Sequence, residues 1–202
     1  DLIWMAEVAE ESTHVWSAKQ RTTVFLSAMR HFAQTLRARG WPVDYRLLDD
    51  AENRGSLGAE LSAAVARHRP AGLVLTAPGD WRVLQSLRNV ARDLQLPLDL
   101  RDDRHFFSTV RDFAAHAQGR KQLRMEYWYR EMRRRHGVLM DGEQPVGGQW
   151  NFDADNRATF GKGGPPALPA RSRFAPDDIT LDVMALVRER FANHPGQIDD
   201  FS

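Results

Sequence analysis

Short apolar runs alternate with longer amphipathic segments through the first half of this chain, and no other feature limits its fold as strongly. The apolar runs have the length and composition of buried strands, and they occupy residues 2–8, 43–48, 72–76 and 98–101. Segments with helical periodicity follow each of them, at residues 19–39, 56–69, 80–94 and 108–117. Because strands that alternate with helices at this spacing form βαβ units, we predict an α/β fold built on a Rossmann-like, doubly wound parallel sheet.

Polar residues mark the starts of two of the predicted helices. Ser56 is expected to be the N-cap of the second helix, because its hydroxyl can accept a hydrogen bond from a free backbone N–H. Asp80 is expected either to cap the third helix, with Trp81 packed in the core, or to form one lip of a ligand crevice together with Trp81 and Arg82. Apolar residues at helical spacing predict the core face of the first helix: Val24, Phe25, Ala28, Phe32 and Leu36.

Composition excludes several classes of protein. The net charge of +1 gives no global basic field of the kind that a dedicated nucleic-acid binder has. The chain has no cysteine, so it supplies no disulfide, thiolate zinc site or cluster ligand. Neither a signal peptide nor an apolar run of about 20 residues is visible, which predicts no membrane partner and favours a cytoplasmic protein. Because Asp1 opens directly onto an apolar run, we expect a fragment that lacks an earlier first strand.

The second half of the chain reads as a helix, a long loop and a final helix. The first of these helices carries an apolar stripe that we interpret as core packing: Met125, Trp128, Tyr129 and Met132. The loop that follows contains Trp150 and Asn151, and it is either a ligand-binding loop or an interdomain linker that acts as a brace. The final helix is predicted over 176–191, with one apolar face made of Ile179, Val183, Leu186 and Val187. The Asp177–Asp178 pair suits its positive N-terminus.

Acidic residues follow the first predicted strand, where an open α/β sheet usually binds its ligand. They are Glu7, Glu10 and Glu11. In this position a carboxylate can accept hydrogen bonds from the hydroxyl or ring N–H groups of a ligand. The alternative is a solvated acidic loop over residues 9–12, paired with Lys19 or Arg21.

Other candidate chemistry is sparse. The sequence has no phosphate-binding loop and no nucleophile motif, so we predict no catalytic residue in this chain. The histidines, His14 among them, do not pair at ligand spacing, so we predict no metal site. An arginine cluster covers residues 130–135. Its members either contact nucleic-acid phosphates, with Arg133 and Arg134 as the candidates, or form a solvated face paired with Glu126 and Glu131.

Four stretches resemble a known family in sequence and in order. They are EVAEEST at 7–13, SAMRHFAQTLRARGW at 27–41, APGDWRV at 77–83 and MEYWYREMRRRHGVLMDGEQPVGGQWNFDADNR at 125–157. Together they resemble the N-terminal half of the deoxyribodipyrimidine photolyase-related proteins, the bacterial (6-4) photolyase-like enzymes and cryptochromes that carry an iron–sulfur cluster. The resemblance covers nearly the whole chain.

The resemblance implies a domain plan. Residues 1–120 would form an α/β antenna-type domain, and residues 121–157 a helix and interdomain loop packed on it. Residues 158–202 would be a linker and helix that lead to an absent C-terminal helical domain, which binds FAD and a [4Fe–4S] cluster. The antenna-type domain can hold 6,7-dimethyl-8-ribityllumazine. By position, Glu11 matches the carboxylate directed toward this chromophore and Phe25 lies beside its ring, with Glu7 and His14 completing the expected site.

The resemblance also implies a function. Full-length relatives act on damaged DNA as carbon–carbon lyases that repair (6-4) photoproducts by light-driven electron transfer from FAD, or they sense blue light. The role expected of this chain is to bind the antenna and to position the flavin domain. The alternative is a stand-alone nucleotide-binding or regulatory α/β module without photochemistry, and a third possibility is a DNA-contacting structural domain.

Overall fold

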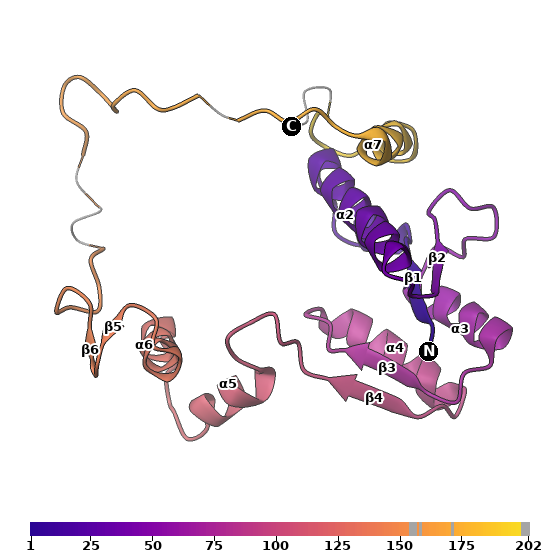
Figure 1. Ribbon diagram of the computed structural model, residues 1–202, viewed down its shortest axis with the longest axis horizontal. Coiled ribbons are helices and arrows are strands. Elements are labelled where there is room, and N and C mark those ends of the chain that lie inside the picture. The colour runs from indigo at the N-terminus through magenta and orange to yellow at the C-terminus, as the bar shows by residue number, and fades with distance from the viewer. Residues whose placement is uncertain (154–156, 158, 171, 199–202) are drawn as a thin grey trace. The chain divides into compact units, whose positions relative to one another are not determined.

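The computed structural model describes residues 1–153, 157, 159–170 and 172–198. The chain divides into two compact units, one made of residues 1–74, 78–99 and 171–202 and the other of residues 75–77 and 100–170. Figure 1 shows the elements of both. The end of the expected interdomain loop, at 154–156, and the last residues, 199–202, lie outside the described residues.

The four strands predicted from the apolar runs are confirmed. In the first unit β1 (Ile3–Ala6) pairs in parallel with β2 (Val43–Arg46), with Ile3 opposite Val43 and Ala6 opposite Arg46. The long helix α2 (Lys19–Ala38) connects them, as a parallel pair requires. A second two-stranded sheet is formed by β3 (Leu73–Thr76) and β4 (Leu98–Arg101). The fold is therefore mixed helix and strand with small parallel pairing, in agreement with the α/β class.

The predicted helix caps are also confirmed. The Ser56 hydroxyl accepts a hydrogen bond from the N–H of Ala59 at 3.3 Å and begins α3 (Leu57–His68). The Asp80 carboxylate accepts from the N–H groups of Arg82, at 2.7 Å, and Val83, at 3.3 Å, and begins α4 (Trp81–Asp93). These contacts satisfy N–H groups that a helix start otherwise leaves free. The expectation that Trp81 packs as core is wrong, because this residue is 71% exposed.

The segment expected to be an acidic loop is instead a short helix, α1 (Glu10–Thr13). Glu10 and Glu11 lie in its first turn, where the positive end of the helix dipole favours negative charge. The Thr13 hydroxyl donates to the carbonyl of Ala9 at 2.9 Å and closes this turn. Local polar contacts therefore give the acidic run a regular structure.

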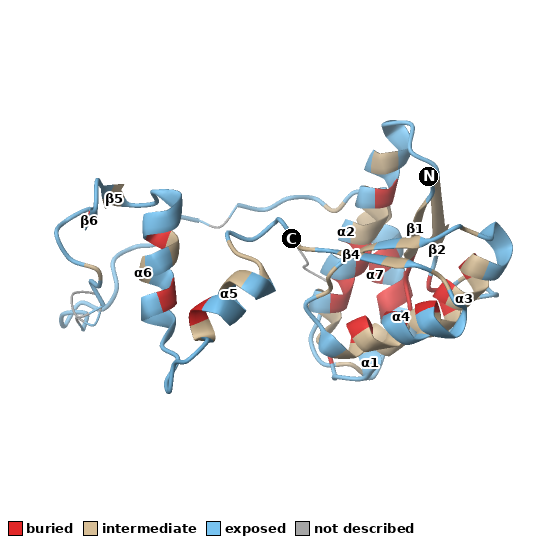
Figure 2. Cartoon of the chain, turned by 90° about the horizontal axis from the view of Figure 1, so that it is seen from below, coloured by how far each residue is buried: buried red, intermediate tan, exposed pale blue. Residues whose placement is uncertain are grey.

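The core of the first unit lies where α2 packs on α7 (Asp178–Arg190). The predicted inner face of α7 is confirmed at Val183, Leu186 and Val187, which are buried. The buried cluster joins both ends of the chain and consists of Leu26, Leu48, Val183, Met184, Leu186, Val187, Phe191 and Ile198. Figure 2 shows buried residues on both helices.

The face predicted as the core side of α2 is wrong. Val24, Phe25 and Phe32 are each at least half exposed. The buried residues are Thr22, Thr23, Leu26, Ser27 and Ala33. Helical spacing identifies the residues that share a face, but the position of α7 decides which face is covered. A polar residue can lie on that face because its hydroxyl bonds locally, as Thr23 does to the carbonyl of Lys19 at 2.9 Å.

The described residues of the second unit form two helices and a small hairpin. They are α5 (Val110–Ala117), α6 (Met125–His136), and the antiparallel strands β5 (Met140–Asp141) and β6 (Gln144–Pro145). The interpretation of the α6 stripe as continuous core is wrong, because Met125 is 72% exposed and Tyr129 is also exposed. Trp128 alone of the stripe is fully buried; its ring lies 5.5 Å, centroid to centroid, from Phe113 of α5.

Candidate ligand-binding cavity

A cavity of about 280 Å³ opens in the first unit at the carboxyl end of β1, where an open α/β sheet is expected to bind a ligand. Its walls come from the end of β1 and the residues after it, from α1, from the first half of α2 and from the first residue of α3, Leu57. The lining includes Glu7, Glu11, Thr22, Phe25, Leu26 and Met29. Three of the four predicted antenna residues therefore line one cavity, whereas His14 is exposed outside its lining.

The Glu7 side chain is held entirely by hydrogen bonds within the protein, and Glu7 as a whole is 1% exposed. Arg30 donates to both carboxylate oxygens, from Nε at 2.7 Å and from Nη2 at 2.9 Å. The Tyr45 hydroxyl, at 2.7 Å, and the Leu48 N–H, at 2.9 Å, complete the set. Since four donors already occupy this carboxylate, Glu7 fixes the wall of the cavity and offers little capacity to a ligand.

This network shifts the pKa values of its partners. The hydrogen bond to Glu7 raises the pKa of Arg30 above its usual range, despite an opposing effect of burial. Burial, reinforced by the hydrogen bond to the Glu7 carboxylate, raises the pKa of Tyr45 far above its usual value. The network therefore keeps Arg30 charged and Tyr45 protonated.

Glu11 pairs with a residue far away in the sequence. Arg82 Nη2 lies 2.7 and 2.9 Å from the two Glu11 oxygens, and Arg82 Nη1 lies 3.5 Å from Glu10. The hydrogen bond to Glu11 raises the pKa of Arg82. The Asp80–Trp81–Arg82 segment thus fulfils both interpretations in part: Asp80 caps α4, and Arg82 holds the carboxylate at the rim of the cavity. The expected pairing with Lys19 or Arg21 is replaced by this contact.

Thr22 is a cavity residue that the sequence did not indicate. Thr22 is 2% exposed, and its hydroxyl has no hydrogen-bond partner among the described residues. A buried hydroxyl without a partner is costly in a finished fold, and Thr22 lies in the lining of the cavity with this hydrogen-bonding capacity unfilled. Threonine is too common in helices for its type alone to have marked the position.

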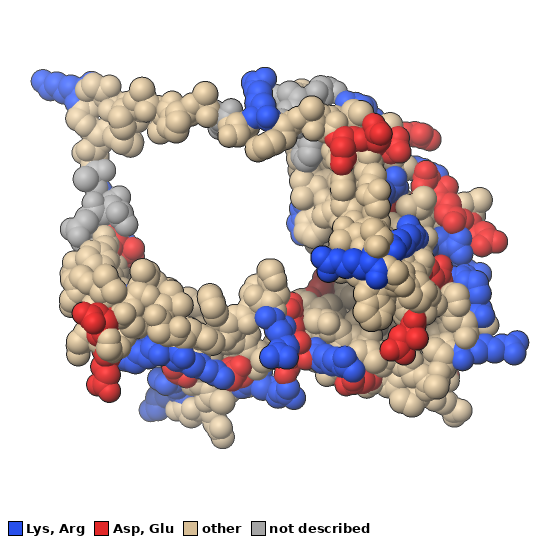
Figure 3. Space-filling view, viewed as in Figure 1, with Lys and Arg blue, Asp and Glu red and all other residues tan. Residues whose placement is uncertain are grey.

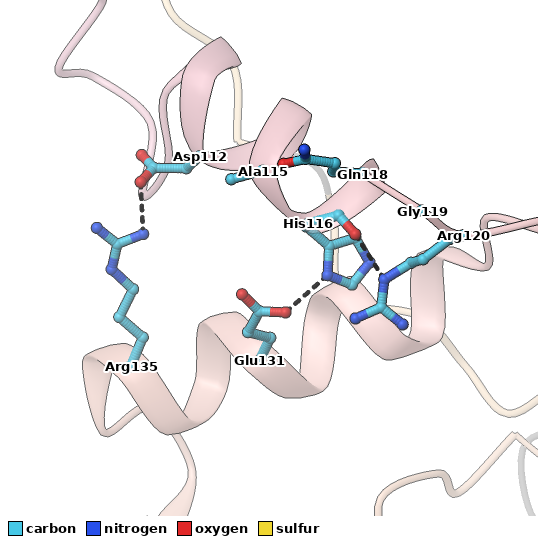
Figure 4. A pocket seen from close by; sticks show the side chains of 8 residues that line it. All are labelled: Asp112, Ala115, His116, Gln118, Gly119, Arg120, Glu131 and Arg135. Carbon is cyan, nitrogen blue, oxygen red and sulfur yellow. Dashed lines mark hydrogen bonds and ion pairs between the residues drawn. The ribbon is translucent and has the colours of Figure 1, made fainter.

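A larger hollow of about 430 Å³ lies in the second unit between α5 and α6 (Figure 4). Its charged groups bind one another: Arg135 contacts Asp112 at 2.8 Å, and His116 Nδ1 contacts Glu131 at 2.6 Å. Arg120 donates from Nε to the carbonyl of His116 at 2.5 Å. The Thr109 N–H, followed by Arg135, holds the pKa of Asp112 well below its usual range. These closed pairs hold α5 and α6 together and engage the charged side chains Asp112, Glu131 and Arg135.

The arginine cluster of α6 is largely engaged with the loop that follows it. The guanidinium groups of Arg130, Arg133 and Arg134 lie 5.4, 5.2 and 4.6 Å from the ring centroid of Trp150. Arg133 is buried and donates to the carbonyls of Val138 and Leu139, whereas Arg134 is exposed. Arg130 pairs with Glu126 as expected. Basic and acidic side chains are interspersed on the face seen in Figure 3, so no single-sign field emerges there.

Two further findings concern metal binding and membrane-spanning helices. The described residues contain no group of three or more His, Asp or Glu side chains placed to bind a metal ion. Within the same part of the chain, no helix has the length and apolar character needed to cross a bilayer.

Comparison with known proteins agrees with the resemblance. The family model described as deoxyribodipyrimidine photo-lyase-related protein matches residues 1–202. A (6-4) photolyase of Agrobacterium fabrum is 43% identical over 206 residues, an alignment that covers 100% of this chain and 39% of that protein. The chain thus spans about two-fifths of the length of this curated relative. It belongs to the deoxyribodipyrimidine photolyase-related family.

Proposed function

We propose that the first unit is the antenna-type domain of a photolyase-like flavoprotein, and that its cavity binds 6,7-dimethyl-8-ribityllumazine. The observation that carries this proposal is the cavity itself, in which an unpartnered Thr22 hydroxyl and the Glu11 carboxylate lie on the walls. A doubly wound, Rossmann-like sheet would extend the β1–β2 pair in the whole protein and would leave the cavity at the carboxyl end of β1.

The size and the lining of the cavity support a flat heteroaromatic ligand. At about 280 Å³ the cavity is near the lower end of ligand sites, which are roughly 300–1,000 Å³. It can therefore enclose a bicyclic ring while a polyol chain extends toward solvent. Phe25, Leu26 and Met29 supply the apolar contacts, and an aromatic ring such as that of Phe25 can stack in an offset arrangement.

The polar residues have distinct roles in this proposal. Thr22 would hydrogen-bond a ring heteroatom, and Glu11, held by Arg82, would accept hydrogen bonds from ribityl hydroxyls. Bound lumazine would supply absorption of near-ultraviolet or blue light. This chain's own residues bind and orient the chromophore and exclude water from it.

For the whole protein we propose the activity implied by the relative named a (6-4) photolyase. Light-driven electron transfer from FAD would repair a (6-4) photoproduct in damaged DNA, or the same photochemistry would signal blue light. FAD and a [4Fe–4S] cluster would belong to a C-terminal domain outside this chain. The present chain contains no cysteine that could ligate a cluster. Of the two candidate DNA contacts, Arg134 is the better one, because Arg133 is buried on backbone carbonyls.

Fluorescence titration with 6,7-dimethyl-8-ribityllumazine tests the antenna proposal. The wild-type chain should bind the compound, and Thr22→Val should weaken binding by roughly twofold to tenfold, the worth of one hydrogen bond. Thr35→Val is the matched control, because Thr35 is on the same helix but is exposed and bonds to the carbonyl of His31. A folded wild-type chain that takes up no lumazine would refute the proposal.

A further inference from the structure

A histidine joins the two helices that form the core of the first unit. The Nδ1 atom of His31, on α2, lies 2.7 Å from the backbone carbonyl of Ser27, and its Nε2 atom lies 2.5 Å from an Asp177 carboxylate oxygen. Asp177 is the N-cap of α7, and its other oxygen accepts a hydrogen bond from the Thr180 N–H at 2.9 Å. One carboxylate therefore caps α7 and connects that cap to α2.

The geometry selects one protonation state of the ring. Both ring nitrogens face oxygen acceptors, but a neutral imidazole has only one N–H to donate. The imidazolium donates to both, and it also gains the charge of Asp177. The cationic form is thus the one that completes the contact between the two helices.

The neighbouring charges act in the same direction. Asp177 is the charged group that α7 directs at the ring, and α2 contributes the Ser27 carbonyl. The adjacent Arg30 is turned to Glu7, which it contacts at 2.7 Å. The hydrogen bond that His31 donates to Asp177, and after it the one that it donates to the Ser27 carbonyl, raises the pKa of His31. The hydrogen bond between His31 and Asp177, and after it the one that the Thr180 N–H donates, lowers the pKa of Asp177 to about 2.

We propose that His31 and Asp177 form a pH-sensitive latch that fastens the first turn of α7 to α2. The latch lies outside the cavity and does not depend on lumazine binding. Below it, Val183 and Val187 of α7 are fully buried in the shared core, so opening the latch releases the first turn while the rest of α7 stays packed.

The direction of the pH dependence follows from the two shifts. Because the pKa of His31 is raised on folding, its contribution is fully present below the unfolded pKa of about 6.5 and is lost as the pH rises through the higher folded value. Because the pKa of Asp177 is lowered, its contribution is lost as the pH falls from about 3.8 through about 2. The latch is therefore closed in mildly acidic solution and opens as the pH rises through the raised folded pKa of His31.

An NMR titration of the histidine rings in the full chain is the direct test. His31 should titrate above about 6.5, and its pKa should fall in Asp177→Asn and in Asp177→Ser. Both substitutions retain a side chain that can cap α7. Asparagine removes the charge and keeps the shape, whereas serine removes the charge and also the second oxygen, the one that contacts His31. The matched control is Asp44→Asn, which removes the carboxylate partner of His68 at 2.7 Å and should leave the pKa of His31 unchanged.

Amide exchange at Thr180 and Leu181 supplies a second readout. Between pH 6 and pH 8.5, protection of these amides should fall further in the wild type than in His31→Gln, by up to about tenfold for each pH unit between the folded and unfolded pKa values of His31. Comparing the two proteins at each pH cancels the intrinsic pH dependence of exchange. A wild-type His31 that titrates at or below about 6.5, or a pKa unaltered by both Asp177 variants, would overturn the proposal.

Discussion

Replacing Glu7 with glutamine should strongly destabilise the first unit, although the two side chains have nearly the same shape. Arg30 Nε and the Tyr45 hydroxyl donate to Oε1, whereas Arg30 Nη2 and the Leu48 N–H donate to Oε2. An amide has one oxygen, so in either orientation its NH₂ group faces two donors. The substitution also leaves the Arg30 guanidinium with only its longer contact to the half-exposed Asp49, at 3.8 Å.

The magnitude follows from the burial of this network. Glu7 has no exposed side-chain surface and Arg30 has 14%, so solvent cannot replace the lost contacts. Breaking a buried ion pair by removing one partner costs about 3–5 kcal/mol. For a chain of this length each kcal/mol lowers the melting temperature by about 2–4 °C, so a decrease of roughly 6–20 °C is expected.

Urea denaturation followed by far-UV circular dichroism measures the free energy of unfolding. The double variant Glu7→Gln/Arg30→Met should be destabilised by less than the sum of the two single variants, because it buries no unpaired charge. The control Glu52→Gln alters a carboxylate that is 79% exposed in its pair with Arg46, and should change stability by less than about 0.5 kcal/mol. A Glu7→Gln loss below about 1 kcal/mol, or additive single effects, would refute the network argument.

Two further predictions concern the second unit. Gly137 ends α6 at φ 65°, and no atom lies within 4 Å of a Cβ added there. Gly137→Ala should therefore lower the free energy of unfolding by about 1 kcal/mol through backbone strain alone. The control Gly161→Ala, in open space without a positive φ, should cause no measurable change in the same urea assay. In the full-length protein, Arg134→Gln should weaken binding of DNA containing a (6-4) photoproduct and lower the slope of log K against log salt by about 1. The control is Arg92→Gln, which changes an exposed arginine that contacts Asp93 at 3.1 Å. A salt slope that changes no more in Arg134→Gln than in this control would exclude Arg134 as a phosphate contact.

Local signals in the sequence predicted the elements well, because the groups that begin and end a helix are close together in the chain. Ser56 and Asp80 cap the helices that they were expected to cap, and Asp177 accepts from the Thr180 N–H at the start of α7. The short helix at Glu10 was missed because an acidic run carries no apolar periodicity. Its structure comes from the helix dipole and from the hydroxyl of Thr13.

The covered side of α2 could not be predicted, because it depends on a helix more than a hundred residues later. Phe25 and Phe32 have the spacing of a core face, but α7 packs on the side of Leu26 instead. Two residues of the candidate site, Glu11 and Phe25, line one cavity, and their role as ligand contacts stays a prediction. Its polar details required the structure, because the Arg82–Glu11 pair spans 71 residues and nothing local distinguishes the buried hydroxyl of Thr22.

The clustering of Leu26 and Leu48 with residues from Val183 to Ile198 has a consequence for biosynthesis. The first unit is discontinuous in sequence, and residues 100–170 of the second unit are translated before residues 171–202, which complete the first unit. About 150 residues separate Leu48 from Ile198, so at translation rates of about 5–20 residues per second the N-terminal segment waits about 8–30 seconds for the rest of its core. During that interval the surface around Leu26 has no native cover, and the order of synthesis, rather than the final stability, sets how long the nascent chain is exposed to misassociation.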